Sequence, residues 1–331
     1  MPMRQFVAFV LLAGVASPGF ALNILLTNDD GLTSNVIALH DALVEAGHDV
    51  VVSLPCTGQS GMGAAAKFFT PLTPLTQPCL NNAALPDDPG AGPVTKSGLG
   101  SGDYYYVNGT PIMAALYGLD VPGLERWGGA PDLVLSGPNE GQNVGGIVNS
   151  SGTVSNAQIA LARGLAAIAL SADANTAGQT AEDGNITANP LSAEVATLSL
   201  ELVDDLIGTA GDRPLLPAGV ALNVNFPKFA AGGSEALSWA FARHGSYNLY
   251  TLRFVTDLGN DPVAQSYGLG DYHYPGMTIE PPAAEATAGQ QEDESLVSQT
   301  RISVTAMQLG FEQSPAGQQW LRLHLRDTFG R

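Results

Sequence analysis

The sequence predicts an α/β fold built on a mostly parallel sheet, and three observations support this. Apolar runs rich in β-branched residues alternate with segments of helical periodicity. Several runs are continuously apolar, as expected for strands covered on both faces. The chain has 331 residues, 45% of them hydrophobic, which is enough for a large core. We expect strands at residues 22–27, 48–55, 104–107, 132–137, 166–171 and 220–227, and helices at 36–46, 112–118, 154–163 and 191–207.

The first predicted strand leads into the motif around which the chain is organised. Residues 28–31 read Asn-Asp-Asp-Gly, and a helical pattern follows, with Ser34 as its expected N-cap. In an open α/β sheet, ligands bind at the loops that follow the carboxyl ends of strands. Asp29 and Asp30 therefore indicate a cation site, but Asn, Asp and Gly also dominate ordinary turns. The motif alone leaves both interpretations open.

Loops after other predicted strands carry further oxygen donors. Ser60 lies in a small, polar segment after the second strand, and Asn139 lies in a glycine-rich loop after a later one. Carboxylate, hydroxyl and amide oxygens suit Mg²⁺, Mn²⁺ or Ca²⁺ and disfavour a zinc site. Ser151, Gly152 and Thr153 precede a predicted helix, where they form either an anion site or plain N-caps. Convergence of these loops would place a cation opposite a phosphate-binding helix start.

The charge of the chain excludes one class of partner. The formal net charge is −18, and the only lysines are Lys67, Lys96 and Lys228. A basic face of the kind that binds nucleic acid is therefore not expected. Because an acidic protein repels anionic ligands at long range, a phosphate ligand would need a local positive charge, which a divalent metal supplies.

Residues 1–21 have the features of a secretory signal. Arg4 precedes an apolar run at residues 6–15, and the small residues Gly19 and Ala21 stand where cleavage is expected. The run is too short to span a bilayer permanently. We expect a secreted or periplasmic protein that begins at Leu22 and has no membrane segment; a buried N-terminal extension is the alternative.

Cys56 and Cys79 are the only cysteines in the chain. In an exported protein, a pair this close in sequence is a credible disulfide. Two unrelated buried thiols are the alternative, because sequence does not supply the geometry that a bridge requires.

Composition suggests how the rest of the chain is organised. Residues 22–235 form the expected α/β core, and residues 71–103 within it, rich in Pro, Gly, Asn and Ser, are expected to be a long, poorly packed surface excursion. Residues 236–331 are expected to form an appended hairpin region that serves as an oligomer contact. It contains aromatic strand-like pieces, an acidic polar linker at residues 283–295 and a strand at residues 301–307.

Six short blocks occur in a fixed order along the chain. They are residues 22–31, Ser60-Gly61, Gly109-Thr110-Pro111, the Ser-Gly-x-Asn-x-Gly of residues 136–141, Ser151-Gly152-Thr153-Val154 and the Asn-Val-Asn-x-Pro of residues 223–227. Together they resemble the SurE survival-protein family, and the ordered set is far more specific than any single block. The resemblance implies a Rossmann-like three-layer α/β/α core with a C-terminal β-hairpin extension used in oligomerisation, as a dimer or a tetramer.

The resemblance also implies an activity. Members of this family are metal-dependent nucleotidases and phosphatases, so we expect hydrolysis of nucleoside 5′- or 3′-monophosphates or related small phosphate esters. The metal, Mg²⁺ or Mn²⁺ with Ca²⁺ as an alternative, would be bound by Asp29, Asp30, Ser60 and Asn139. The expected catalytic residues are Asp29 and Asp30, both as metal ligands, and the general base is left unassigned. The phosphate would be bound by Ser151, Gly152 and Thr153.

Two departures from the family's pattern keep another function open. Residues 62–66, Met-Gly-Ala-Ala-Ala, replace a more polar stretch, and residues 112–115, Ile-Met-Ala-Ala, replace a segment that normally carries Asp-Cys. The first of these motivates the alternative of a secreted metal- or nucleotide-binding protein that has lost catalysis. A dinucleotide-dependent oxidoreductase is disfavoured because no Gly-x-Gly-x-x-Gly follows the first strand.

Overall fold

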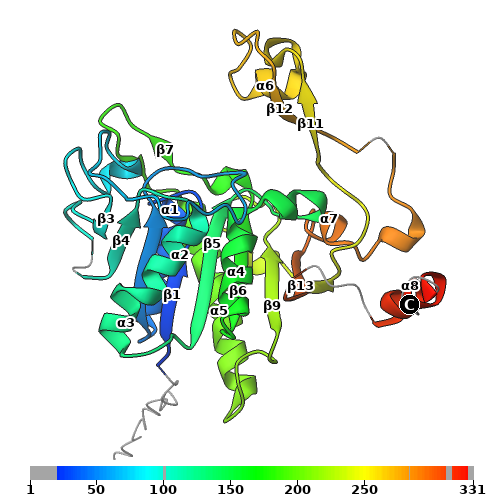
Figure 1. Cartoon of the computed structure of the whole chain (residues 1–331), viewed down its shortest axis with the longest axis horizontal. Helices are drawn as coiled ribbons and strands as arrows, with labels where there is room; N and C mark the ends of the chain where they lie inside the picture. Colours follow the sequence, from blue (N-terminus) through cyan, green and yellow to red (C-terminus); the bar gives the residue numbers. More distant parts are fainter. Residues whose placement is uncertain (1–20, 100–101, 283, 311–314, 327–331) are drawn as a thin grey trace, which may run out of the picture.

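A nine-stranded sheet forms the centre of the molecule in the computed structural model, which describes residues 21–99, 102–282, 284–310 and 315–326 (Figure 1). The strand order is β10-β13-β9-β6-β5-β1-β2-β4-β3. The strands are β1 (Asn23–Thr27), β2 (Asp49–Pro55), β3 (Ala91–Pro93), β4 (Tyr104–Val107), β5 (Leu133–Glu140), β6 (Ala167–Ala172), β9 (Val220–Asn225), β10 (Trp239–Ala242) and β13 (Ile302–Gln308). The run from β4 to β9 is parallel throughout, as predicted, whereas β3, β13 and β10 run antiparallel to it.

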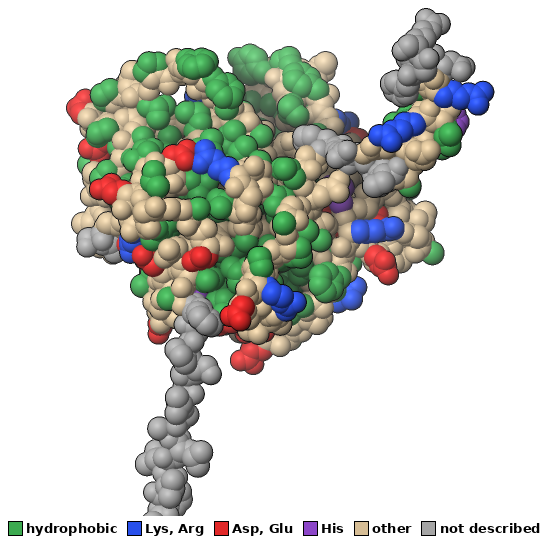
Figure 2. Space-filling model, turned by 60° about the horizontal axis from the view of Figure 1, so that its bottom comes forward, with side chains coloured by type: hydrophobic (Ala, Val, Ile, Leu, Met, Phe, Trp, Pro, Cys, Tyr) green, Lys and Arg blue, Asp and Glu red, His purple; other side chains and the backbone are tan. Residues whose placement is uncertain are grey.

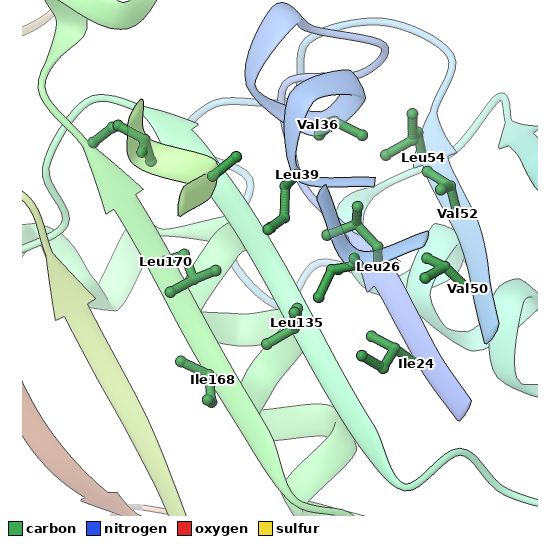
Figure 3. Close-up of a cluster of buried hydrophobic side chains, with 14 of the residues drawn as sticks. Ile24, Leu26, Val36, Leu39, Val50, Val52, Leu54, Leu135, Ile168 and Leu170 are labelled. Atoms are coloured by element: carbon green, nitrogen blue, oxygen red, sulfur yellow. The ribbon is translucent and has the colours of Figure 1, made fainter. Parts of the chain in front are cut away.

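Helices cover both faces of the sheet, which gives the expected three layers. Helices α1 (Ser34–Glu45) and α5 (Pro190–Ala210) pack together, and so do α2 (Pro111–Asp120) and α4 (Gly152–Ala162), with α3 (Pro122–Trp127) following α2. Alternate residues of a strand point to opposite faces. Ile24 and Leu26 therefore join the cluster that contains Leu39 of α1 (Figure 3). Leu25 joins the other cluster, which contains Val154 of α4.

The structure corrects one detail at the start of α1. The N-cap is Thr33, whose hydroxyl accepts a hydrogen bond from Val36 N at 3.4 Å. Ser34, the expected cap, is the first helical residue, and its hydroxyl accepts a hydrogen bond from Asn189 N at 2.9 Å. Both residues are good caps by type, so the choice depends on where the chain enters the helix.

The segment at residues 71–103 packs more closely than expected. Leu75, Ala83 and Ala84 are buried in the main hydrophobic cluster, and Tyr106 Oη donates a hydrogen bond to Pro89 O at 2.6 Å. The predicted disulfide between Cys56 and Cys79 is present. The expectation of a poorly packed excursion is therefore wrong for the part around residues 75–84.

Only part of the C-terminal third stands apart from the core. Strands β11 (Thr251–Val255) and β12 (Gly276–Glu280) form an antiparallel hairpin with α6 (Pro262–Ser266) between them, and Figure 1 shows it projecting from the sheet. By contrast, β10 and β13 belong to the central sheet. The remaining strands and α-helices among the described residues are β7 (Gln179–Thr180), β8 (Ile186–Thr187), α7 (Glu294–Val297) and α8 (Pro315–His324).

The surface carries few basic groups. On the face shown in Figure 2, Lys and Arg side chains are scattered among apolar and polar ones. Among the described helices, none combines the length and the apolar character needed to cross a membrane. The expected signal segment lies outside the described residues, apart from Ala21.

Candidate active site

The turn after β1 is shaped by a side chain within it. Asn28 Oδ1 accepts a hydrogen bond from Gly31 N at 3.1 Å, and Asn28 Nδ2 donates to Gly31 O at 2.8 Å. Asn156 Nδ2 of α4 donates to Asn28 O at 3.1 Å. These bonds fix the backbone of the turn at the carboxyl end of β1, where it presents Asp29 and Asp30.

This turn lies at the point where the strand order reverses. The chain passes from β1 to β2 on one side and later places β5 on the other side of β1. Loops diverge at such a point, and ligands of open α/β folds bind there. The end of β5 is irregular between Ser136 and Asn139, where Gly137 has φ +121° and an added Cβ would lie 2.0 Å from Leu170 O. Only glycine fits at that bend, which carries Asn139 towards the turn after β1.

Three of the four predicted metal ligands, Asp29, Ser60 and Asn139, line one pocket of about 620 Å³, whereas Asp30 is not among its lining residues. Its polar end is lined by Asp29, Ser60, Asn139, Glu140 and Ser151. The Asp30 carboxylate accepts hydrogen bonds from the Ser60 side chain and from Glu140 N, the latter at 3.0 Å. The loops therefore converge as expected, while the roles assigned to their residues stay predictions.

The start of α4 contacts the Asp29 carboxylate. Thr153 Oγ1 donates a hydrogen bond to Asp29 Oδ1 at 2.5 Å, and an added Cβ at Gly152 would lie 2.6 Å from Asp29 Cβ. Ser151 acts as the N-cap, because its hydroxyl accepts a hydrogen bond from Val154 N. Of the three predicted phosphate-binding residues, only Ser151 lines the pocket. The hydroxyl of Thr153 donates its one hydrogen to Asp29 and so orients that carboxylate.

The acidic groups of the pocket perturb one another. Burial, reinforced by the charge of Asp30, raises the pKa of Asp29 to about 7. Burial also raises the pKa of Asp30 above its usual value, and burial together with the Asp30 charge raises the pKa of Glu140 to about 7. No Lys, Arg or His is present among the described residues that line the pocket. The site therefore concentrates negative potential that the surrounding side chains do not neutralise.

These donors fit a hard divalent cation. Asn139 Nδ2 donates to Gly141 O at 2.7 Å, but its buried Oδ1 has no hydrogen-bond partner within the described part of the chain. An unpaired buried acceptor is costly unless a ligand satisfies it. Within the same residues, no group of three or more His, Cys, Asp and Glu side chains is arranged to hold a metal. The set is thus two carboxylates with neutral oxygens, which suits an ion such as Mg²⁺ that retains water ligands.

Comparison with known proteins places this geometry in a family. The family model described as "Survival protein SurE" matches residues 24–249, which is more than half of the chain. The chain belongs to the SurE family. The crystal structure of the SurE protein from Aquifex aeolicus superposes with a TM-score of 0.61 at 26% identity, over 91% of this chain and 99% of that one.

Three curated relatives match this SurE chain over different shares of its length. A 5′-nucleotidase SurE from Thermosipho melanesiensis is 30% identical over 86% of this chain and 92% of its own length. An acid phosphatase from Yarrowia lipolytica is 32% identical over 62% of this chain and 56% of its own length. The match to a 5′-nucleotidase SurE from Desulfatibacillum aliphaticivorans, at 34% identity, spans 62% of this chain and 66% of that relative.

The sequence analysis missed an acidic pair that supports the site loop of this SurE chain. Residues 283–295 were expected to form a polar linker, but Asp293, Glu294 and Ser295 are fully buried. Glu294 Oε1 accepts a hydrogen bond from Gly145 N at 3.0 Å and lies 2.9 Å from His244 Nδ1. Glu294 therefore anchors the loop that follows Asn139.

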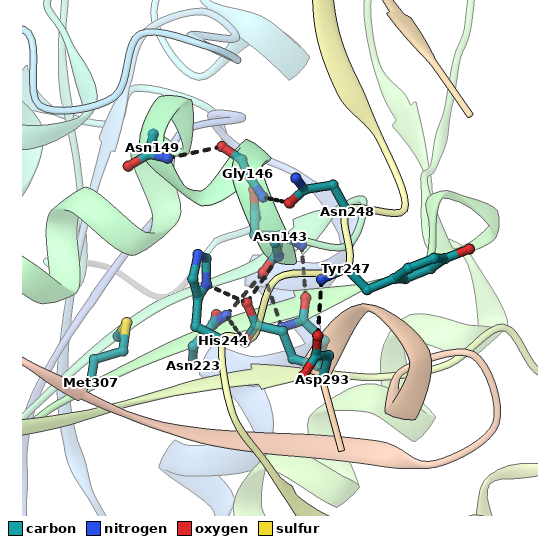
Figure 4. Close-up of polar contacts among 12 residues, drawn as sticks. Asn143, Gly146, Asn149, Asn223, His244, Tyr247, Asn248, Asp293 and Met307 are labelled. Atoms are coloured by element: carbon teal, nitrogen blue, oxygen red, sulfur yellow. Dashed lines mark hydrogen bonds and ion pairs between the residues drawn. The ribbon is translucent and has the colours of Figure 1, made fainter. Parts of the chain in front are cut away.

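Asp293 anchors the base of the projecting hairpin in the same cluster. Its carboxylate accepts hydrogen bonds from Ser246 N and Tyr247 N at 2.8 and 2.9 Å and from Arg243 Nε at 2.8 Å. Burial opposes ionisation, but these donors hold the pKa of Asp293 below its usual value. Figure 4 shows Tyr247 beside Asp293, and Asn248 bonded to the backbone of Gly146 in the site loop. The cluster thus ties the hairpin to the candidate active site.

Glu140 is the other residue that the sequence analysis overlooked. It follows Asn139 at the carboxyl end of β5 and lines the pocket, and its Oε1 accepts a hydrogen bond from Gly178 N at 3.4 Å. Adjacency to a predicted ligand was the one signal that could have found it.

Proposed function

We propose that this chain is a divalent-metal-dependent phosphomonoesterase that hydrolyses nucleoside 5′- or 3′-monophosphates or related small phosphate esters. The observation that carries the proposal is that the buried Asp29 and the unpaired Asn139 Oδ1 line one pocket beside the start of α4, with the half-buried Asp30 next to Asp29 and bonded to Glu140 N. The names of the relatives, 5′-nucleotidase SurE and acid phosphatase, support hydrolysis of phosphoric monoesters.

The metal would be held by Asp29, Asp30, Ser60 and Asn139. When bound, such an ion neutralises the charge that builds on the phosphoryl oxygens during transfer. Hydrogen bonds within the chain orient the two carboxylates that would bind the metal. Thr153 Oγ1 donates to Asp29, and Glu140 N donates to Asp30. The backbone N–H groups at the start of the eleven-residue helix α4 favour an anionic phosphate next to Ser151.

The test compares Asp30→Asn with Asp212→Asn, a change of the same charge at an exposed position. With p-nitrophenyl phosphate and added Mn²⁺, we expect Asp30→Asn to lower kcat/KM on the order of a hundredfold or more. Asp212→Asn should retain activity, and a chelator should abolish phosphate release by the parent chain. Full activity of Asp30→Asn would show that the ligand assignment is wrong.

The second candidate is a secreted binding protein that has lost catalysis. It is favoured by residues 62–66, Met-Gly-Ala-Ala-Ala, which replace a polar stretch of the family pattern and directly follow Gly61, a lining residue of the pocket. This reading requires nucleotide or metal binding without turnover. Chelator-sensitive release of phosphate from any ester would refute the proposal of a binding protein without catalysis.

We also propose export and self-association. Export is supported by the composition of residues 1–21 and agrees with the Cys56–Cys79 disulfide, since such bridges persist in oxidising compartments. Self-association is supported by α8, which stands away from the core in Figure 1 and leaves Trp320 and Leu323 about 60% exposed. N-terminal sequencing of secreted material and light scattering of the purified protein test the two proposals.

A further inference from the structure

The proposed hydrolysis uses only the acidic side of the pocket of about 620 Å³, which also has an apolar wall. Opposite the acidic residues, it is lined by apolar side chains of the projecting hairpin and of the segment around α6. Those with the largest side chains are Leu252, Tyr267, Leu269, Met277 and Ile279. One cavity thus has a polar end at the strand termini and an apolar end on the hairpin.

This apolar wall is open to solvent. Tyr267 is 74% exposed, Met277 62% and Leu252 39%. Leu252 pairs with Ile279 across the hairpin, so their side chains are neighbours on the same face. A contiguous row of exposed large apolar groups beside a polar centre is characteristic of a ligand-binding surface.

The apolar wall offers hydrophobic surface and the aromatic ring of Tyr267. It has few polar groups that are free to hydrogen-bond with a ligand and, among its described residues, none with a positive charge. Thr278 Oγ1 already donates to Asp261 Oδ1 at 2.8 Å. Gln142 Nε2 already donates to Phe226 O and Ser298 O, both at 2.8 Å. With no Lys, Arg or His among the described lining residues, a second phosphate group would meet no positive charge at this end.

We propose that the hairpin wall binds the leaving group of the ester, with the Tyr267 ring stacking on it. This proposal rests on the proposed function and narrows its substrate class. The preferred substrates are monophosphates of uncharged, flat leaving groups, which are nucleosides and aryl alcohols. Polyphosphates and bisphosphates are disfavoured because their additional charge would lie against the apolar wall. The volume of the pocket, about 620 Å³, is in the range of pockets that enclose a small ligand, so a nucleoside monophosphate can be accommodated.

The experiment uses Tyr267→Ala with two companion variants. Tyr267→Phe keeps the ring, and Tyr274→Ala removes a comparably exposed tyrosine of the same hairpin region that does not line the pocket. For each protein, KM and kcat are measured with Mn²⁺ for adenosine 5′-monophosphate and for glycerol 2-phosphate, which has no ring. Unchanged thermal midpoints exclude unfolding.

We expect Tyr267→Ala to raise the ratio of the two KM values, nucleotide over glycerol phosphate, about tenfold. This is in the lower part of the range for base–aromatic stacking, as suits a ring that is 74% exposed. Tyr267→Phe and Tyr274→Ala should keep the parent ratio. An unchanged ratio in Tyr267→Ala, or an equal change in Tyr274→Ala, overturns the proposal.

Failure of the two proposals can be told apart by calorimetric titration with adenosine 5′-monophosphate and Mn²⁺. If the parent chain binds the nucleotide but releases no phosphate, the hydrolase proposal fails, and a loss of affinity in Tyr267→Ala still supports the hairpin wall. If the parent chain releases phosphate but Tyr267→Ala binds the nucleotide as tightly as the parent, the wall is refuted and the hydrolase proposal stands.

Discussion

The metal-free protein should lose stability as the pH rises from about 4 to 7, and Asp29→Asn should remove the part of that loss that Asp29 causes, leaving the parts caused by Asp30 and Glu140. Asp29 is 3% exposed and next to Asp30, and burial and the neighbouring charge raise its pKa from 3.8 to about 7. Between these values the folded state binds more protons than the unfolded state, so the free energy of unfolding falls with pH. The penalty is absent below pH 3.8 and complete above pH 7.

The size of the effect follows from the displacement of that pKa. At about 1.4 kcal/mol per unit, a shift from 3.8 to about 7 corresponds to roughly 4 kcal/mol at pH 8. The asparagine of Asp29→Asn still accepts a hydrogen bond from Thr153, but more weakly than a carboxylate. We therefore expect the variant to be about 3 kcal/mol more stable than the parent chain at pH 8.

The assay is urea denaturation in the presence of a chelator, from pH 4 to pH 8. Asp212→Asn, which removes an exposed charge, is the control and should follow the parent curve. Adding Mn²⁺ at about a hundred times its Kd should restore roughly 2.7 kcal/mol to the parent chain and little to Asp29→Asn. Parallel stability curves for the parent chain and Asp29→Asn would refute the reasoning, because they would show that this carboxylate causes no penalty.

Three further predictions concern the surroundings of the site. Gly152→Ala should lower kcat/KM at least about tenfold, because its Cβ would lie 2.6 Å from Asp29 Cβ and displace that carboxylate. Asp293→Ala should lower the free energy of unfolding by about 3–5 kcal/mol in urea titrations, because the N–H groups of Ser246 and Tyr247 and the Arg243 guanidinium lose the buried carboxylate that accepts their hydrogen bonds. Replacing Cys56 and Cys79 by serine should cost about 3 kcal/mol in the same assay, the chain-entropy value for a loop of 23 residues.

Gly152→Ala has a matched control, and each of the other two predictions has an outcome that would contradict it. Gly208→Ala adds a methyl group in α5 with nothing within 4 Å and should leave activity unchanged; a similar loss there would mean that the effect of Gly152→Ala is not local. A change below about 1 kcal/mol in Asp293→Ala would contradict its anchoring role. Alkylation of both thiols in folded protein without reductant would contradict the disulfide.

The parts of the site that could be predicted depend on chemistry within a few residues. Asn28 shapes its turn through Gly31, three positions away, and the apolar run before it pairs as a buried strand. Alternation of strands and helices, together with the parallel order, then brings the ends of β1 and β5 to one edge. This is why Asp29 and Asn139 could be assigned to one site without coordinates.

The predictions that were wrong concern residues whose partners lie far along the chain. An acidic segment such as residues 283–295 has the composition of a solvated linker, yet Asp293 is buried because Ser246 and Tyr247 supply N–H groups from 47 and 46 residues away. Similarly, the proline-rich stretch around Leu75 is packed because it meets the main cluster beside the disulfide. Composition describes the cost of burying such residues but not the contacts that offset it.

Residue types and their order therefore decided the parallel strands of the sheet, the acidic turn and the oxygen donors, since each follows from local propensity, apolar periodicity and ligand chemistry, whereas the place of β10 and β13 in the sheet was not predicted. Folding in three dimensions decided that Thr153 orients Asp29, that Glu294 anchors the loop at Gly145, and that the hairpin at residues 251–280 forms the apolar wall. The physical reason is that these contacts join segments more than a hundred residues apart, whose relative positions depend on packing of the whole core.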